Sequence, residues 1–314
     1  MERVERTPAF SLGYVWERER FLAAVMIAPA ALYTIALVGF PFVLAILYSL
    51  SDATTGDPTV RFVGLRTYGF LLQDPVFLKA LQNTFVFTFA SQILVLVLAK
   101  ILALVLMEDF PGRRLVRFLI LLPWTAPISL SVIGWLWIFD SVFSPLDWLA
   151  RSLGLLGRPE ALLGPEQNLY WLGRPFLAMA SVVLVQTWRI LPLATVILLA
   201  GLTAIPRDIL DAAQVDGAGF WRRLFQVIMP LLLPVMSIAF LFGFVFTFTD
   251  MTVVYVLTRG GPINSTQVLA SWAFFKGIEA GDLAQGAAIA FFLFPALAGL
   301  SALVLLLARR AEVS

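Results

Sequence analysis

The sequence contains no cysteine and no histidine, and only 13% of its 314 residues are charged. The chain therefore has no disulfide, no thiol nucleophile, no Cys/His site for structural zinc and no imidazole for acid–base catalysis. It also lacks a Gly-x-x-x-x-Gly-Lys-Ser/Thr phosphate loop, which excludes ATP hydrolysis by that route. Soluble domains carry roughly twice this charged fraction, so the composition favours a membrane protein.

Hydrophobic residues make up 60% of the chain and gather in long runs. A helix needs about 20 apolar residues to cross a bilayer. The first run is about twice as long as the apolar part of a signal peptide, so we expect it to be retained. The sequence predicts an all-α membrane protein with six transmembrane helices, at 21–50, 84–107, 117–139, 176–201, 230–257 and 284–308.

The basic residues indicate an orientation. If the N-terminus is cytoplasmic, the inside segments hold 12 basic residues in 64 positions and the outside segments hold 8 in 95. Basic residues are enriched in cytoplasmic loops, so we expect both termini in the cytoplasm. Residues 1–20 would then form a cytoplasmic tail, and 21–314 the transmembrane domain. There is no basic stripe for nucleic acid, despite the net charge of +2.

The loop 202–229 differs from the other connections. Pro206 suits the first turn of a helix, and Asp216-Gly217 is a turn signal that precedes a second amphipathic segment. The pattern predicts a cytoplasmic helix–turn–helix. Small side chains around the turn would let its backbone seat in a groove of another protein, or would let the loop pack against its own helices. These small residues are Ala212, Ala213, Gly217 and Ala218.

This loop resembles a family motif, written Glu-Ala-Ala-x-x-x-Gly-x9-Ile-x-Leu-Pro, of binding-protein-dependent ABC importer permeases. The chain has Asp211-Ala212-Ala213, then Gly217, and later Ile228-Met229-Pro230. Asp211 stands for the usual glutamate and Met229 for the usual leucine. The stretch Thr258-Arg259-Gly260-Gly261-Pro262 resembles the sugar permeases related to maltose and glycerol-3-phosphate transport, with Arg259 as a departure.

The resemblance covers nearly the whole chain, with a core of about 80–308, and implies the type I ABC importer permease (MetI-like) fold. It implies half of a pathway for a sugar or sugar-like solute in a prokaryotic inner membrane. The chain itself would be no enzyme and hold no cofactor, because partner ATPase subunits bind ATP and Mg. The implied partners are a second permease, two ATPase subunits and an extracytoplasmic solute-binding protein.

Several alternatives stay open at this point. The solute could be other than a sugar, and a channel or secondary transporter would share the hydropathy. However, a secondary transporter usually shows two related halves, which are not evident in this sequence. The second permease could be an identical or a different chain, and either one could hold the transmembrane binding site.

The resemblance implies contact with the ATPase through the loop around 211–218. A large residue at Ala213 would then uncouple ATP hydrolysis from transport and leave the fold intact. The residues expected to couple are Asp211, Ala212, Ala213, Asp216, Gly217, Ala218, Arg222 and Arg223.

Polar residues within spans are costly in hydrocarbon, so they are candidates for the substrate pathway. Arg189 and Asp250 either line this path or pair with each other. A tryptophan could stack on a sugar ring, although in a span it more often packs or anchors. The pathway candidates are Gln186, Arg189, Thr247, Asp250, Trp135 and Asn83, with Gln92 beside them in the second span.

Overall fold

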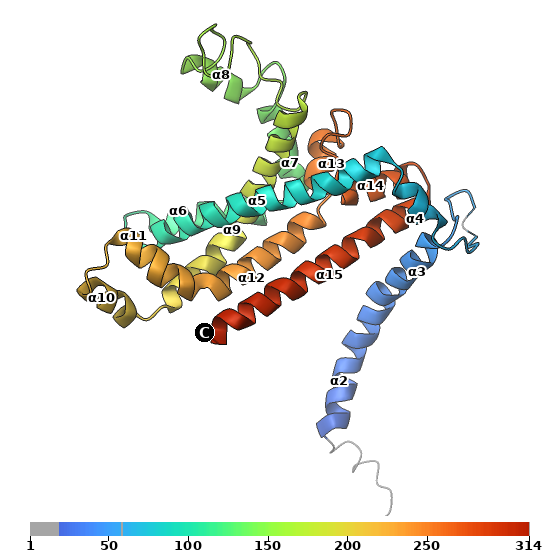
Figure 1. The fold of residues 1–314 in the computed structure, drawn as a ribbon, viewed down its shortest axis with the longest axis horizontal. Helices are drawn as coiled ribbons and strands as arrows, with labels where there is room; N and C mark the ends of the chain where they lie inside the picture. The colour runs from blue at the N-terminus through green and yellow to red at the C-terminus, as the bar shows by residue number, and fades with distance from the viewer. Residues whose placement is uncertain (1–18, 58, 314) are drawn as a thin grey trace, which may run out of the picture.

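The computed structural model describes residues 19–57 and 59–313, which form helices joined by loops (Figure 1). Most of the predicted tail 1–20 lies outside the described residues. The helices are α2 (Glu19–Thr34), α3 (Phe40–Ser49), α4 (Arg66–Leu71), α5 (Pro75–Met107), α6 (Arg113–Thr125), α7 (Ile128–Ile138), α8 (Pro145–Ser152), α9 (Pro175–Ala204), α10 (Arg207–Val215), α11 (Phe220–Arg223), α12 (Met229–Phe248), α13 (Thr252–Thr258), α14 (Leu269–Phe274) and α15 (Leu283–Val313), with π-helical turns η1 (Ile35–Gly39), η2 (Leu224–Ile228) and η3 (Phe275–Glu279).

Five long apolar helical segments confirm five of the six predicted spans. Each is long and apolar enough to cross a membrane: Phe21–Ser49, Pro75–Met107, Pro175–Ala204, Phe220–Phe248 and Leu283–Leu306. The second span begins nine residues before its predicted start. Asp74 causes this extension, because its carboxylate accepts a hydrogen bond from the Val76 N–H at 2.8 Å and Pro75 fits the first helical position.

The third predicted span, 117–139, is not one continuous helix. Its residues form α6 and α7, whose axes differ by 100°. The break falls at Ala126 and Pro127. Proline disfavours a helical conformation in the residue before it, and Ala126 is extended, with φ −72° and ψ 144°. The predicted span 117–139 is therefore present as a bent pair of helices and not as one straight helix, because the apolar run conceals the turn.

The fifth span also differs from the predicted 230–257. The helix starts at Phe220, passes through η2 into α12 and ends at Phe248, and α13 is a separate helix. The turn η2 ends just before Pro230, which has no N–H for the backbone ladder. A π-helical turn lets the Met229 N–H bond to the Leu224 carbonyl, so the helix continues into the proline. The second half of the predicted helix–turn–helix is thus continuous with a span.

The centre of the bundle is the pair α5 and α9, which pack along their length, with α6, α12 and α15 around them (Figure 1). One buried cluster joins α5, α9, η2 and α12 near α10, and includes Val95, Leu198 and Leu232. A second joins α5, α7, α9 and α13. We call the two ends of the bundle the α10 end and the α8 end, after the helix that lies beyond each.

The α8 loop, residues 139–174, has an internal polar anchor. Asp147 is fully buried and accepts hydrogen bonds from the Trp171 indole N–H at 2.9 Å and the Leu169 N–H at 3.1 Å. The Ser144 hydroxyl caps α8 by accepting from the Asp147 N–H at 3.3 Å. These bonds give this long connection a fixed shape of its own.

Candidate functional site

The predicted helix–turn–helix is present at the α10 end. Pro206 precedes α10 as its N-cap residue, and Gly217 takes the left-handed conformation, with φ 73°. The turn closes through hydrogen bonds from the Gly217 N–H to the Gln214 carbonyl and from the Ala218 N–H to the Ala213 carbonyl, at 3.0 and 2.9 Å. A side chain at Gly217 would be strained at this φ, although open space surrounds the position.

The small residues of this turn do not all face the same way. Ala212, Asp216 and Gly217 are exposed and available to a partner, and Ala218 is half-buried. Ala213 is only 8% exposed and packs against its own chain. A large residue at Ala213 would disturb the fold of the loop itself, so an intact fold cannot be expected there. The exposed Ala212 is the better position for testing a partner contact.

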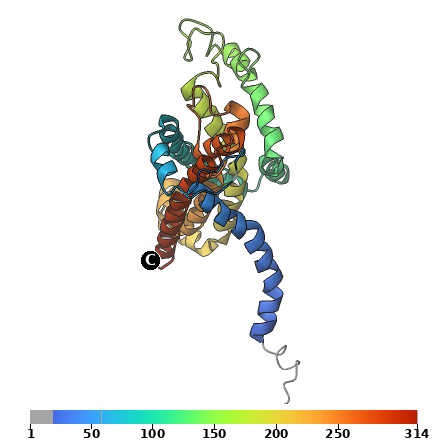
Figure 2. The same cartoon turned by 90° about the vertical axis from the view of Figure 1, so that its right-hand side faces the viewer.

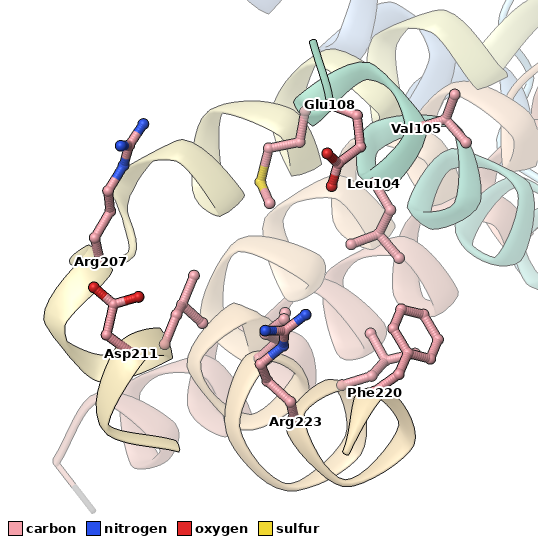
Figure 3. A pocket seen from close by; sticks show the side chains of 11 residues that line it. Leu104, Val105, Glu108, Arg207, Asp211, Phe220 and Arg223 are labelled. Carbon is pink, nitrogen blue, oxygen red and sulfur yellow. The ribbon is translucent and has the colours of Figure 1, made fainter. Parts of the chain in front are cut away.

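Two of the predicted coupling residues also line a cavity, although Asp211 is exposed to solvent and Arg223 is half-buried. Asp211 and Arg223 line a cavity of about 480 Å³ between α5, α10 and α11, which Figure 3 shows. The two predicted arginines therefore differ in position, because Arg223 lines the cavity and Arg222 does not. Arg222 is exposed and donates a hydrogen bond to the Gln226 side chain at 3.0 Å.

A buried polar cluster joins α5, α9 and α12 inside the bundle. The side-chain amides of Gln92 and Gln186 both donate to the Thr247 hydroxyl, at 3.0 and 3.1 Å, and all three residues are fully buried. In the described part of the chain, the amide oxygens of both glutamines have no hydrogen-bond partner. The cluster therefore has unused capacity to accept hydrogen bonds.

Arg189 and Asp250 form an ion pair one turn further along α9 from Gln186. An Arg189 Nη1 atom lies 2.5 Å from the Asp250 carboxylate, and the two side chains are 19% and 7% exposed. Asp250 lies in the break between α12 and α13, and its second oxygen accepts from the Val253 N–H at 3.0 Å. The predicted possibility that these residues pair with each other is confirmed. Asp250 also stabilises the first turn of α13, because it accepts the hydrogen bond from the Val253 N–H.

The other two pathway candidates lie apart from this cluster. Asn83 is buried near the α8 end, where its amide donates to the carbonyls of Ser265 and Gln267 at 2.9 and 3.0 Å. Its side chain thus holds α5 to the loop after α13. Trp135 on α7 stacks on Phe139, with ring centroids 5.4 Å apart, and meets Trp188 edge to face at 5.6 Å.

Some residues of the site could not be predicted from the sequence, because their importance depends on their neighbours in the fold. Gly243 lies on α12 directly against the Gln92 side chain, and a glycine within an apolar run was the only available signal. Glu108 and Arg207 line the cavity with Asp211 and Arg223, and no local motif marks them. Within residues 19–57 and 59–313, no group of three or more acidic side chains has a geometry that could hold a metal ion.

Comparison with known proteins places this geometry in context. Residues 95–313 match the family described as "Binding-protein-dependent transport system inner membrane component". The trehalose transport system permease protein SugA of Mycobacterium tuberculosis is 32% identical, over 94% of this chain and 91% of the relative. The trehalose/maltose transport system permease protein MalF of Thermococcus litoralis is 31% identical, over 88% and 90%.

Solved structures show the same fold. A chain of a bacterial ABC transporter involved in the import of the acidic polysaccharide alginate matches with a TM-score of 0.78 at 17% identity, over 95% of this chain and 98% of that one. A chain of the alginate transporter in complex with its pentasaccharide-bound periplasmic protein matches with a TM-score of 0.74 at 18% identity, over 95% of each chain. The broken third span and the separate α13 are thus parts of an ABC transporter permease fold of the MetI-like type.

Proposed function

The chain belongs to the family of binding-protein-dependent transport system inner membrane components, and we propose that it forms half of the translocation pathway of an ATP-driven sugar importer. It is a multi-pass, non-catalytic membrane subunit, and ATP is hydrolysed by a separate subunit. The observation that carries the proposal is the exposed turn of the α10 loop. There a left-handed glycine and small side chains present the backbone to a partner.

The cargo class follows from the relatives. Their names refer to trehalose and maltose, and the similarity extends over nearly the full length of each chain. A sugar presents many hydroxyl groups, which donate as well as accept hydrogen bonds. The unpartnered amide oxygens of Gln92 and Gln186 supply acceptors for such hydroxyls when the helices around them separate. We assign Gln186, Thr247, Arg189 and Asp250 to the pathway wall on this basis.

Four kinds of partner complete the proposed transporter. A solute-binding protein delivers cargo, as in the complex of the alginate transporter with its periplasmic protein. A second permease, of a different sequence, forms the other half of the path. Two ATPase subunits bind ATP and Mg below the α10 end. The protein would lie in a prokaryotic inner membrane. Both termini would lie in the cytoplasm with α10, because six crossings return the chain to its starting side.

Coupling would run through the turn of the α10 loop. Closure of the ATPase dimer would move α10, and α11 would transmit this motion because it continues through η2 into α12 without a break. Thr247 lies near the far end of α12 and bonds to both glutamines, so a shift of α12 acts directly on the buried cluster. ATP binding can favour one state only through its different affinity for the two states.

The proposal is tested by co-purification and ATP hydrolysis. We would express the chain with the products of its neighbouring genes, purify the assembly and measure hydrolysis with and without a sugar-loaded binding protein. One second permease and two ATPase subunits should co-purify with each copy of the chain, and one loaded binding protein should stimulate hydrolysis. A chain that purifies alone and binds no ATPase would overturn the proposal.

A pair of variants separates coupling from folding. Ala212→Trp adds bulk to the exposed turn, whereas Ala204→Trp adds it to an exposed position at the end of α9, outside the turn. Ala212→Trp should abolish sugar-stimulated hydrolysis while expression and thermal stability stay unchanged. Ala204→Trp should retain stimulation. Equal stimulation by both variants would remove the turn from the coupling path.

A further inference from the structure

The outward face of α8 is apolar. Trp148 and Leu153 are each 65% exposed, and Phe143 in the turn before the helix is 84% exposed. The exposed positions of the helix recur every three or four residues, so they form one face. Exposed apolar surface of this kind marks contact with a protein partner or a membrane. We call this surface the α8 face, and it consists of Val142, Phe143, Pro145, Trp148, Leu149, Ser152 and Leu153.

The charged side chains of α8 point into the loop and not toward the outside. The Asp147 carboxylate is fully buried, where it accepts the hydrogen bonds from Leu169 and Trp171. The Arg151 guanidinium is half-buried and donates to the Asn168 side chain at 2.9 Å. A helix at the boundary between a protein core and water has the reverse arrangement, with its apolar side inward. The orientation of α8 therefore indicates apolar surroundings on its outer side.

Polar groups within the α8 face are paired inside the loop. The Asp140 carboxylate accepts hydrogen bonds from the N–H groups of Val142 and Phe143, at 2.8 and 2.7 Å. The hydroxyl of Ser152, which is the one polar side chain of the face, donates to the Leu149 carbonyl at 2.8 Å. A backbone polar group needs such an internal partner before it can leave water for lipid. The α8 face can thus enter an apolar layer without losing these hydrogen bonds.

The apolar surface of the spans continues into the α8 loop from both sides. Trp137 in the last turn of α7 is 78% exposed, and Phe176 in the first turn of α9 is 82% exposed. The loop between these two helices stands out from the bundle in both views (Figures 1 and 2). A solute-binding protein must dock and leave in every cycle, and interfaces of that kind are no more apolar than the rest of a protein surface. Continuity with the membrane-spanning helices therefore favours lipid as the occupant.

We propose that α8 is an interfacial helix whose α8 face binds the lipid surface at this end of the bundle. Tryptophan and leucine are typical of the apolar side of such helices, which lies about 5–10 Å into the boundary between headgroups and acyl chains. Phe143, Trp148 and Leu153 would occupy this boundary, and the rest of the loop would stay in water. This contact with lipid is independent of the solute that the transporter carries.

A lipid-bound α8 would also fix the depth of α9. Asp147 on the inner side of α8 holds Leu169 and Trp171, which lie just before α9 along the chain. Through these hydrogen bonds, the membrane surface would hold the first turn of α9 at one level while the α10 end moves with the ATPase.

Fluorescence quenching from the lipid side tests this proposal. The chain contains no cysteine, so a single introduced cysteine can carry an environment-sensitive fluorophore. The full-length labelled chain is placed in nanodiscs of phosphatidylethanolamine and phosphatidylglycerol that contain a nitroxide-labelled lipid. The nitroxide lies on the headgroup, high on the acyl chain or near the end of the acyl chain. Measurements are made on the chain alone and on its assembly with the co-purified subunits, in which cysteines are replaced by serine.

Labels on the α8 face and labels elsewhere in the same loop should respond differently. Phe143→Cys, Ser152→Cys and Leu153→Cys should lose most fluorescence to nitroxides on the headgroup and high on the acyl chain. The matched controls Glu160→Cys and Gln167→Cys replace exposed polar residues of the loop, and no nitroxide lipid should quench them. Iodide in the water should give the opposite pattern. Ser152→Cys is nearly isosteric, so it tests the face even if a larger change disturbs folding, which thermal stability reports.

Three results would overturn the proposal. One is equal quenching by nitroxide lipids at the α8 face and at the control positions. Another is quenching of the face by iodide that disappears when a loaded solute-binding protein is added, which would assign the face to that protein. The third is lipid quenching that disappears once the second permease is assembled, which would make the face an interface between permeases. Quenching by lipid is measured without cargo or ATP, so its failure is distinguishable from failure of the transport function.

Discussion

A methyl group at Gly243 would collide with the buried glutamine that it faces. A Cβ atom at Gly243 would lie 2.2 Å from the Oε1 atom of Gln92 and 3.0 and 3.1 Å from its Cδ and Nε2 atoms. Gln92 is fully buried and donates to Thr247, so it can move away only by giving up that bond. Gly243→Ala should therefore destabilise the contact between α5 and α12.

The size of the effect follows from three contributions. Overpacking a filled interior costs about 1–3 kcal/mol. An interhelical hydrogen bond in a membrane protein contributes about 0.6 kcal/mol on average. Against these losses, alanine is favoured over glycine in a helix by about 0.8–1 kcal/mol. Together they predict that Gly243→Ala lowers the free energy of unfolding by about 0.6–2.8 kcal/mol.

The assay is denaturation in mixed detergent micelles, arranged as a double-mutant cycle with Gln92→Ala. In that background the collision disappears, so Gly243→Ala should be neutral or stabilising by up to about 1 kcal/mol. Gly134→Ala on α7 is the matched control, because a Cβ there meets nothing within 4 Å. If Gly243→Ala costs nothing in the wild-type background, or costs the same after Gln92→Ala, the reasoning from this contact is refuted.

Three other substitutions test other parts of the structure. Asp250→Asn leaves the Arg189 guanidinium unpaired, and unfolding titrations should show that the free energy of unfolding falls by about 3 kcal/mol. This is the low end for a broken buried ion pair, because Arg189 is partly exposed. Replacing both residues by leucine should recover most of the lost stability. Gly286→Ala places a Cβ 2.4 Å from the Gly277 Cα atom, and backbone cannot rotate away, so a loss above that of Gly243→Ala is expected in the same titration. Asp147→Ala leaves the buried Leu169 N–H unsatisfied, at a cost of about 1–3 kcal/mol, and also removes the acceptor of the part-buried Trp171 indole N–H. Limited trypsinolysis should then cut the α8 loop faster, while unchanged cleavage would contradict the anchor.

The spans and the α10 loop could be predicted because their signals are local. Apolar length identifies a crossing, and an Asp-Gly pair such as Asp216-Gly217 identifies a turn whatever lies around it. The left-handed φ of Gly217 and the helices on either side agree with this expectation. Such features depend on residues within one or two helical turns.

The bend at Pro127 and the position of Asp250 could not be predicted in the same way. A proline within an apolar run can be accommodated by a π-helical turn, as at Pro230, or can end the helix, as at Pro127. The choice depends on what packs nearby, since α7 lies against α13 instead of extending α6. The burial of Ala213 likewise depends on how the α10 loop packs against the bundle.

The cavity could not be predicted from the sequence, because the residues that line it are still more distant from one another along the chain. Glu108 and Arg223 come from segments more than a hundred positions apart, and each alone reads as an ordinary charge beside a membrane end. Arg189 and Asp250 were predicted as a possible pair only because both are costly in a membrane. The structure brings them together through the break after α12.

The first helix, α2, diverges from the bundle in both views (Figures 1 and 2), and none of the residues in the most apolar window of its span is buried. Its biogenesis is therefore separable from that of the other helices. It can leave the translocon for lipid as soon as it is made, whereas α5 and α9 must wait for α12, because Gln92 and Gln186 both donate to Thr247 on that helix. Substitutions in α2 should change the yield of inserted protein without changing the cooperativity with which the bundle unfolds.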